Sequence, residues 1–123
     1  MDVRLKRAYE PATAEDGYRV LIDRLWPRGI SKKQAKLDEW AKELAPSSQL
    51  REWFGHEPSR FPEFRRRYID ELREDAPRLK ELRRRARMRT LTLVYSAHDS
   101  EHNDAVVLAE VLRRGLPNSA RRR

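Results

Sequence analysis

A five-residue motif late in the chain has residue types and a spacing that could bind a metal. His98, Asp99, Ser100, Glu101 and His102 form H-x-x-E-H, a pattern found in one class of zinc peptidases. In those enzymes both histidines lie on a formed helix. Here His98 directly follows a strand-like stretch, and Asp99 or Ser100 resembles the N-cap of the next helix. We therefore expect a strand-to-helix turn and no metal site.

Asp23 is the one weak candidate for acid–base chemistry, and no other catalytic residue can be assigned. It follows the apolar run Val20–Ile22 and precedes Arg24, with Arg28 close by. A carboxylate at the end of a buried strand can act as a general base if burial raises its pKa. It can equally neutralise Arg24 or Arg28 as a structural counter-ion. The sequence leaves both roles open.

Three apolar, β-favouring segments are the strands that would position these residues. They run from Val3 to Ala8, from Arg19 to Leu25 and from Thr90 to Ser96. The second and third are separated by helical patterns, which favours parallel pairing over a hairpin.

Apolar side chains recur at helical spacing in the rest of the chain. Ser31 and Gln34 form a capping box, which predicts a helix with Leu37, Trp40, Ala41 and Leu44 on one face. Four more predicted helices bury, in order, Leu50, Trp53 and Phe54; Phe61, Phe64, Tyr68 and Leu72; Leu79, Leu82 and Ala86; and Ala105, Val106, Leu108, Ala109 and Leu112. We expect one α/β domain over residues 1–117, with a parallel or mostly parallel sheet of about three strands covered by helices. Residues 118–123 should form a disordered basic tail.

Parallel strands end at the same edge of a sheet, and ligands of open α/β sheets bind there. Guanidinium groups bind oxyanions, and a helix N-terminus offers free N–H donors. An anionic small molecule, such as a nucleotide or a phosphorylated metabolite, is the predicted ligand. The predicted binding residues are Lys6, Arg7, Tyr9, Asp23, Arg24, Trp26, Arg28, Tyr95 and Asn103.

The excess positive charge supports an alternative function. Net charge is +8, and residues 60–89 hold twelve Lys or Arg against six Asp or Glu. Such a distribution suits a nucleic-acid-binding or transcription-related regulatory module, although acids between the arginines also fit a solvated helix face. The arginines concerned are Arg65, Arg66, Arg67, Arg83, Arg84 and Arg85.

Composition excludes several other classes. The chain has no cysteine, so a disulfide framework, a thiolate metal site and a cysteine nucleophile are ruled out. No apolar run approaches the roughly 18 residues that span a bilayer, and the first residues lack a signal-peptide pattern. We expect a cytoplasmic protein with no membrane contact and no cofactor. The sequence leaves its oligomeric state undetermined.

Four segments resemble a known family. They are KRAYEP (6–11), DGYRVLIDRLWPRGI (16–30), LREWFGHEPSRFPEFRRRYIDEL (50–72) and LTLVYSAHDSEHNDAVVLAEVLR (91–113). Together they resemble the YeaO-like family, domain of unknown function 488, which implies a small bacterial α/β protein of unassigned activity. Larger relatives carry a cysteine at the end of the last strand and a Cys-His-Arg at the following helix. This chain has Tyr95 and Asn103-Asp104 in those regions, so the resemblance implies no cysteine-dependent activity.

Overall fold

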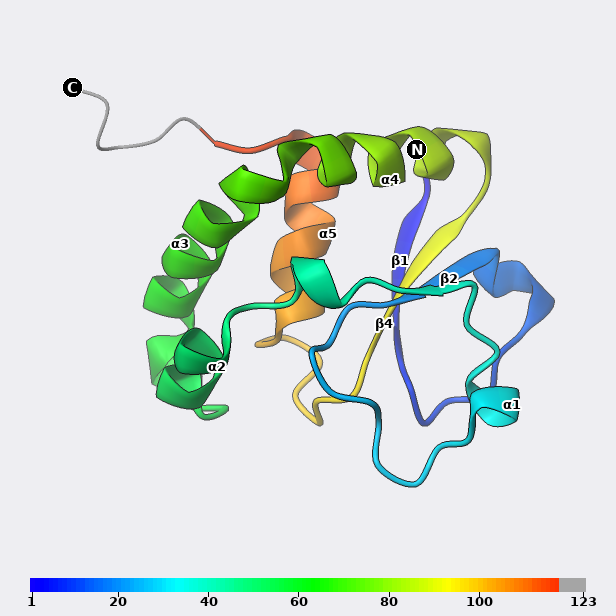
Figure 1. Cartoon of the computed structure of the whole chain (residues 1–123), viewed down its shortest axis with the longest axis horizontal. Helices are drawn as coiled ribbons and strands as arrows, with labels where there is room; N and C mark the ends of the chain where they lie inside the picture. The colour runs from blue at the N-terminus through cyan, green and yellow to red at the C-terminus, as the bar shows by residue number, and fades with distance from the viewer. Residues whose placement is uncertain (118–123) are drawn as a thin grey trace.

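Four parallel strands form the sheet in this computed structural model, which describes residues 1–117 (Figure 1). Their spatial order is β1-β4-β2-β3. Their bounds are β1 Val3–Arg7, β2 Tyr18–Leu21, β3 Glu39–Trp40 and β4 Leu91–Tyr95. The predicted tail, residues 118–123, lies outside the described residues.

β4 is the centre of the sheet and brings distant parts of the chain together. Its register pairs Leu91 with Val3 of β1 and with Tyr18 of β2. All five residues of β4 are buried, as expected of a strand covered on both faces. Since every pairing is parallel, the loops that follow β1, β2 and β4 emerge at one edge.

Helices cover one face of this sheet. α5 packs on β1 and β4, α3 packs on α5, and α2 packs on α3, while α4 runs across the amino-terminal end of the strands (Figure 1). The helices are α1 Lys32–Ala35, α2 Ser48–Phe54, α3 Phe61–Leu72, α4 Ala76–Met88 and α5 Asp104–Arg114. Short 3-10 helices span Ala14–Asp16, Lys42–Leu44, Pro58–Arg60 and Arg73–Asp75.

Each face of the sheet buries its own apolar cluster. The helical face holds the main core, which includes Val20 and Leu93 of the sheet and Leu108 of α5. The opposite face holds a smaller apolar cluster in which Trp26, Leu37 and Trp40 cover Leu21, Val94 and Ala8. In the last helix Val107 and Val111 are buried, whereas Val106, predicted to point inward, is partly exposed.

The predicted α/β class, with a parallel sheet covered by helices, is confirmed. One helix was predicted wrongly. α1 ends after a single turn because Lys36 adopts the left-handed conformation with φ 46°. Residues 38–41 then pair with β2: the Asp38 N–H donates to Arg19 O, and the Ala41 N–H donates to Leu21 O, each at 2.8 Å. The apolar spacing that indicated a helix instead occurs in a short additional strand, β3, and in the 3-10 turn that follows it.

Within residues 1–117 no helix is long and apolar enough to cross a membrane.

Candidate functional site

A cavity of about 610 Å³ opens at the carboxyl edge of the sheet. Three segments form most of its wall: the loop after β2 (residues 23–28), the loop between β4 and α5 with the first residue of α5 (residues 96–104), and the end of α2 (residues 51–56). This is the edge where open parallel sheets bind ligands. We name it the carboxyl-edge cavity.

Two aspartates face each other in this cavity. The side chains of Asp23 and Asp104 are hydrogen-bonded to one another, and both line the cavity wall. Burial raises the pKa of Asp104 well above its usual range, and the charge on the Asp23 carboxylate raises it further. Two carboxylates this close cannot both ionise readily, so the pair retains a proton. The cavity therefore contains both a carboxylate acceptor and a carboxyl donor.

Asp23 is held firmly at the end of its strand. Its Oδ2 accepts hydrogen bonds from the Ser96 backbone N–H at 2.9 Å and from the Ser96 hydroxyl at 2.7 Å. The indole Nε1 of Trp40 donates to the Asp23 backbone carbonyl at 2.7 Å. Among the described residues no ion pair joins Asp23 to Arg24 or Arg28, so the counter-ion role is not the one that the structure shows.

Asp104 is placed by the start of α5. Asn103 is the N-cap, and its Oδ1 accepts the Val106 N–H at 3.0 Å while its Nδ2 donates to Asp99 O at 2.7 Å. Asp104 itself accepts hydrogen bonds from backbone N–H groups of this first turn. The chain's own side chains therefore occupy N–H donors that we expected to be free for an anion.

Three arginines supply positive charge around the acid pair. Arg24, Arg28 and Arg51 line the cavity. The Arg24 Nε donates to Pro46 O at 3.2 Å, which fixes that side chain against the start of α2. Within residues 1–117 the guanidinium groups of Arg28 and Arg51 have no hydrogen-bond or ion-pair partner. Two guanidinium groups are thus available to an anion.

Six of the nine predicted ligand-binding residues line this cavity, namely Tyr9, Asp23, Arg24, Trp26, Arg28 and Asn103. Tyr9 donates its hydroxyl hydrogen to Arg28 O at 3.0 Å, which ties the loop after β1 to the loop after β2. Tyr95 does not line the cavity; it is buried in the main core, where burial raises the pKa of its hydroxyl.

Arg7 acts on the cavity through the backbone instead of lining it. Its Nε donates to Ala97 O at 2.8 Å and its Nη2 donates to Ser96 O at 2.9 Å. The guanidinium also lies over the Tyr9 ring, 4.9 Å from its centroid. These contacts fix the loop that presents Ser96 to Asp23.

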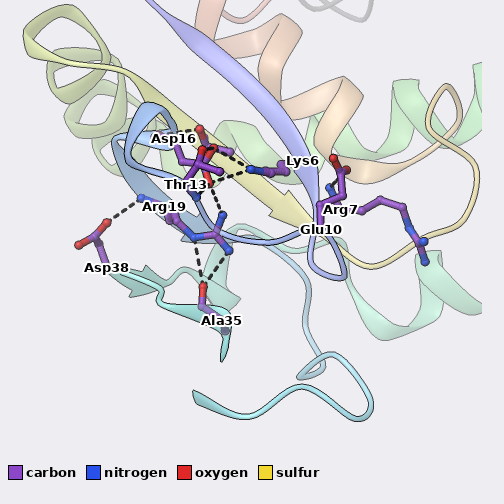
Figure 2. A network of polar contacts seen from close by, with 9 residues as sticks. Lys6, Arg7, Glu10, Thr13, Asp16, Arg19, Ala35 and Asp38 are labelled. Atoms are coloured by element: carbon purple, nitrogen blue, oxygen red, sulfur yellow. Dashed lines mark hydrogen bonds and ion pairs between the residues drawn. The ribbon is translucent and has the colours of Figure 1, made fainter. Parts of the chain in front are cut away.

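Lys6 lies in a separate polar network on the non-helical face of the sheet. Figure 2 shows it pointing to Asp16, while the neighbouring Arg7 extends away. Lys6 Nζ lies 3.0 Å from Asp16 Oδ1, and Arg19 Nη1 lies 2.7 Å from Asp16 Oδ2. Burial raises the pKa of Asp16, but hydrogen bonds from Thr13, Lys6 and Arg19 lower it by more, to about 2. Lys6 is therefore committed to a structural ion pair.

Asp104, Ser96 and Arg51 are cavity residues that the sequence did not single out. Asp104 resembles any acid in the first turn of a helix, where carboxylates are generally favoured. The one available signal was an acid next to an N-cap residue after a buried strand. It could not reveal the pairing with Asp23, 81 positions earlier in the chain.

The H-x-x-E-H segment is a turn before α5, as its context predicted, although the N-cap is Asn103 and not Asp99 or Ser100. Asp99 organises the turn by accepting the backbone N–H groups of Glu101 and His102 and pairing with the His102 ring at 2.8 Å. Both histidines precede the helix, so the helical spacing of a zinc site does not arise. In the described part of the chain no three His, Asp or Glu side chains are grouped so that they could hold a metal ion.

The arginines of the alternative function are largely engaged within the protein. Arg65 pairs with Glu110, and Arg66 and Arg67 both pair with Glu63. Arg85 lies over the Tyr18 ring, 4.3 Å from its centroid, and 4.0 Å from Glu81. Arg83 lines a second groove, and exposed Arg84 makes none of these contacts. The triplets Arg65–Arg67 and Arg83–Arg85 do not present six equivalent free charges.

The fold and the cavity define a small α/β protein with a parallel sheet and a carboxyl-edge site. Residues 2–122 match the family model described as "Inactive DUF488-N3 subclade". The chain is 47% identical over 113 residues to the "Uncharacterized protein YeaO" of Escherichia coli (strain K12), covering 92% of this chain and 98% of the relative. It is 44% identical over 110 residues to the "Uncharacterized protein Rv3073c" of Mycobacterium tuberculosis (strain ATCC 25618 / H37Rv), covering 89% and 92%. The chain therefore belongs to the YeaO-like DUF488 family, as its sequence motifs indicated. No solved structure matches it significantly.

Proposed function

We propose that the carboxyl-edge cavity binds a small anionic molecule that also carries hydroxyl groups, of the class of a nucleotide or another phosphorylated metabolite. One observation carries the proposal: the hydrogen-bonded side chains of Asp23 and Asp104 lie in the same 610 Å³ cavity as three arginines. Cavities of this size accommodate small-molecule ligands.

The arginines suit the anionic part of such a ligand. Guanidinium groups match phosphate and carboxylate oxygens in planar, bidentate geometry. Arg28 and Arg51 make no competing hydrogen bond or ion pair in the described chain, so binding an anion costs them no existing partner. With one proton on the aspartate pair, the three arginines also outweigh the charged carboxylates of the pair and of Asp99.

The aspartate pair suits the hydroxyl part. An ionised carboxylate accepts hydrogen bonds from ligand hydroxyl groups, whereas a protonated carboxyl can also donate one. Asp23 is already oriented by Ser96, so its geometry is fixed before a ligand arrives.

Aromatic side chains add an apolar surface for a sugar or base ring. Trp26, Phe54 and Phe64 line the cavity, and the rings of Phe54 and Phe64 stack at 4.4 Å. Trp26 is held by the bond from its Nε1 to Ile30 O at 2.6 Å. Clefts that combine apolar walls with a few fixed polar groups are typical of ligand sites.

The proposed activity is binding and not catalysis. The matching subclade is described as inactive, which supports this choice, as does the chain's lack of cysteine. The proposal requires no resident cofactor.

The test is a thermal-shift screen of the full chain with inorganic phosphate, ribose 5-phosphate and nucleoside monophosphates. A ligand at 100 times its dissociation constant should stabilise the fold by about 2.7 kcal/mol. Arg28→Gln combined with Arg51→Gln should weaken binding at least tenfold, because both guanidinium contacts are lost.

Lys33→Gln combined with Lys32→Gln is the matched control. It removes two exposed positive charges from α1, outside the cavity, and should leave the affinity unchanged. Binding equally weakened by both double variants, or no stabilisation by any of these compounds at millimolar concentration, would contradict the proposal.

A further inference from the structure

A second, smaller groove lies at the opposite end of the molecule. Its volume is about 280 Å³, and it is lined by α4 and by the C-terminal end of α5; none of its lining residues belongs to the carboxyl-edge cavity. Figure 1 shows α4 lying across the end of α5. One wall carries Lys80, Arg83 and Arg87 of α4. The other wall is apolar or small and consists of Val111, Gly115 and Leu116. We name it the α4–α5 groove.

The three basic residues differ from the arginines of α3 in having no acidic partner. Within residues 1–117 none of their side chains forms an ion pair or hydrogen bond. The side chains of Arg65, Arg66 and Arg67, in contrast, each pair with a glutamate. The Arg83 Nε is buried and has no acceptor among the described residues. A buried donor without an acceptor is costly, so this groove would gain from an acceptor that enters it.

The spacing of the charges indicates an extended polyanion. Lys80, Arg83 and Arg87 lie along one side of α4, and a rise of 1.5 Å per residue places their backbones about 4.5 and 6 Å apart along the axis. A chain of phosphates can contact such a row one after another, whereas a single small anion would meet only part of it. The Arg83 side chain is recessed in the groove, which suits a narrow strand better than a flat membrane surface.

The groove walls also define what would be recognised. Among the described residues no aromatic side chain lines the groove, so these residues provide no platform on which bases could stack. Phosphate contacts by Lys and Arg carry no sequence information.

We infer that the α4–α5 groove binds the phosphate backbone of a single-stranded nucleic acid, without sequence preference, through Lys80, Arg83 and Arg87. This site is separate from the carboxyl-edge cavity, and neither proposal depends on the other. It also moves the nucleic-acid hypothesis from the arginine triplets to one row on α4.

The test is fluorescence anisotropy of a labelled 20-nucleotide single strand with the full chain over a range of salt concentrations. Each lost phosphate contact on a single strand lowers the slope of log affinity against log salt by about 0.7. The triple variant Lys80→Gln, Arg83→Gln, Arg87→Gln should therefore lose about 2 from this slope and at least tenfold in affinity. Oligonucleotides of different sequence should bind alike.

The matched control is Lys32→Gln, Lys33→Gln, Lys36→Gln. It removes three exposed positive charges from α1 and its C-cap, and Figure 1 shows α1 well away from α4. Equal losses in both triple variants would overturn the inference, because net charge alone would then explain binding. So would no binding of the parent at 50 mM salt, or binding to phosphatidylserine vesicles that the oligonucleotide fails to displace. The triple variant in the α4–α5 groove could be too unstable to assay. In that case the single variant Arg87→Glu, at an exposed position, must still weaken binding more than Lys33→Glu does.

Discussion

Asp16 and Asp104 are two aspartates whose surroundings move their pKa values in opposite directions. Lys6, Arg19 and the Thr13 backbone N–H surround Asp16, and its pKa falls to about 2 despite burial (Figure 2). Burial and the neighbouring Asp23 carboxylate raise the pKa of Asp104. The first site has all its partners within the protein. The second brings like charges together beside a cavity, an arrangement that folding alone does not require and that is typical of functional sites.

The arginine near Asp16 and two of those that line the carboxyl-edge cavity differ in the same way: the first has partners within the protein, and the other two have none among the described residues. Arg19 donates to Asp16 and, through Nε and Nη2, to Ala35 O at 3.1 and 2.7 Å, while its backbone N–H donates to Asp38. Its side chain is only 4% exposed, so its contacts with Asp16 and Ala35 are shielded from water. In the carboxyl-edge cavity, Arg28 and Arg51 face open space without partners in the described chain. A network of satisfied groups stabilises the fold, and unsatisfied groups at a cavity are available for a ligand.

The largest expected effect that would test this comparison is that of Asp16→Asn. Removing this carboxylate leaves the buried Arg19 guanidinium without a counter-charge, and breaking a buried pair in this way typically costs about 3–5 kcal/mol. We expect a loss of that size in the free energy of unfolding, measured by urea denaturation. A cost below about 1 kcal/mol would mean that the network is not structural.

The loss of unfolding free energy at acidic pH should depend on the same Asp16 network, and this effect should be smaller than that of Asp16→Asn. The folded pKa of Asp16 is about 2 against an unfolded value of 3.8, so the contribution is present above about pH 4 and is lost as pH falls through 2. The difference corresponds to about 2 kcal/mol. Denaturation series at pH 5, 3.5 and 2.5 should show a steeper loss in the parent than in Asp16→Asn. Parallel curves would contradict the assignment.

Asp23→Asn should cost about 1 kcal/mol. The amide oxygen can still accept a hydrogen bond from Ser96, but a bond to a charged acceptor becomes a bond to a neutral one. Urea denaturation of Asp23→Asn and Asp16→Asn under identical conditions makes the comparison direct. Equal losses in the two variants would restore the view that Asp23 is a structural counter-ion.

Much of the fold could be predicted because burial leaves a direct mark on sequence. The strand at Leu91–Tyr95 is buried on both faces and is apolar throughout except for Thr92. The end of α2 could be placed because Gly55 adopts φ 54° at its C-cap. The helix predicted over residues 37–44 was wrong because the spacing of its apolar residues fits a helix as well as a short strand and turn. Asp38 decided the outcome through its contacts with Arg19 of β2, which no local pattern encodes.

The candidate site was only partly predictable, for a related reason. Asp23, Arg24 and Arg28 could be placed because they follow a strand whose end lies at the ligand-binding edge. Lys6 and Arg7 could not both reach one cavity, since neighbouring residues on a strand point to opposite faces. Asp104 was missed because its partner Asp23 comes from a remote segment. Asp104 is unusual because of the geometry of the loop between β4 and α5, and not because of its residue type.

The smallest expected effect, and the sharpest one, is that of Asp104→Asn near pH 3.5. An asparagine resembles the protonated aspartate that the folded site favours, and below the unfolded pKa of 3.8 the unfolded chain is mostly protonated at this position too, so the free energy of unfolding should change by less than about 0.5 kcal/mol there. At higher pH the two proteins should diverge. The folded pKa of Asp104 is raised, so its contribution is fully present below the unfolded pKa and is lost as pH rises from there through the folded pKa. The parent should lose stability as pH rises toward 8, whereas Asp104→Asn lacks this loss and should become the more stable protein. His56 and His98, which also line the cavity, are present in both proteins, so the difference between the two curves isolates Asp104. Urea denaturation at pH 3.5, 5 and 8 gives that difference. If Asp104→Asn is less stable at every pH, Asp104 is ionised in the folded state, and the contrast with Asp16 disappears.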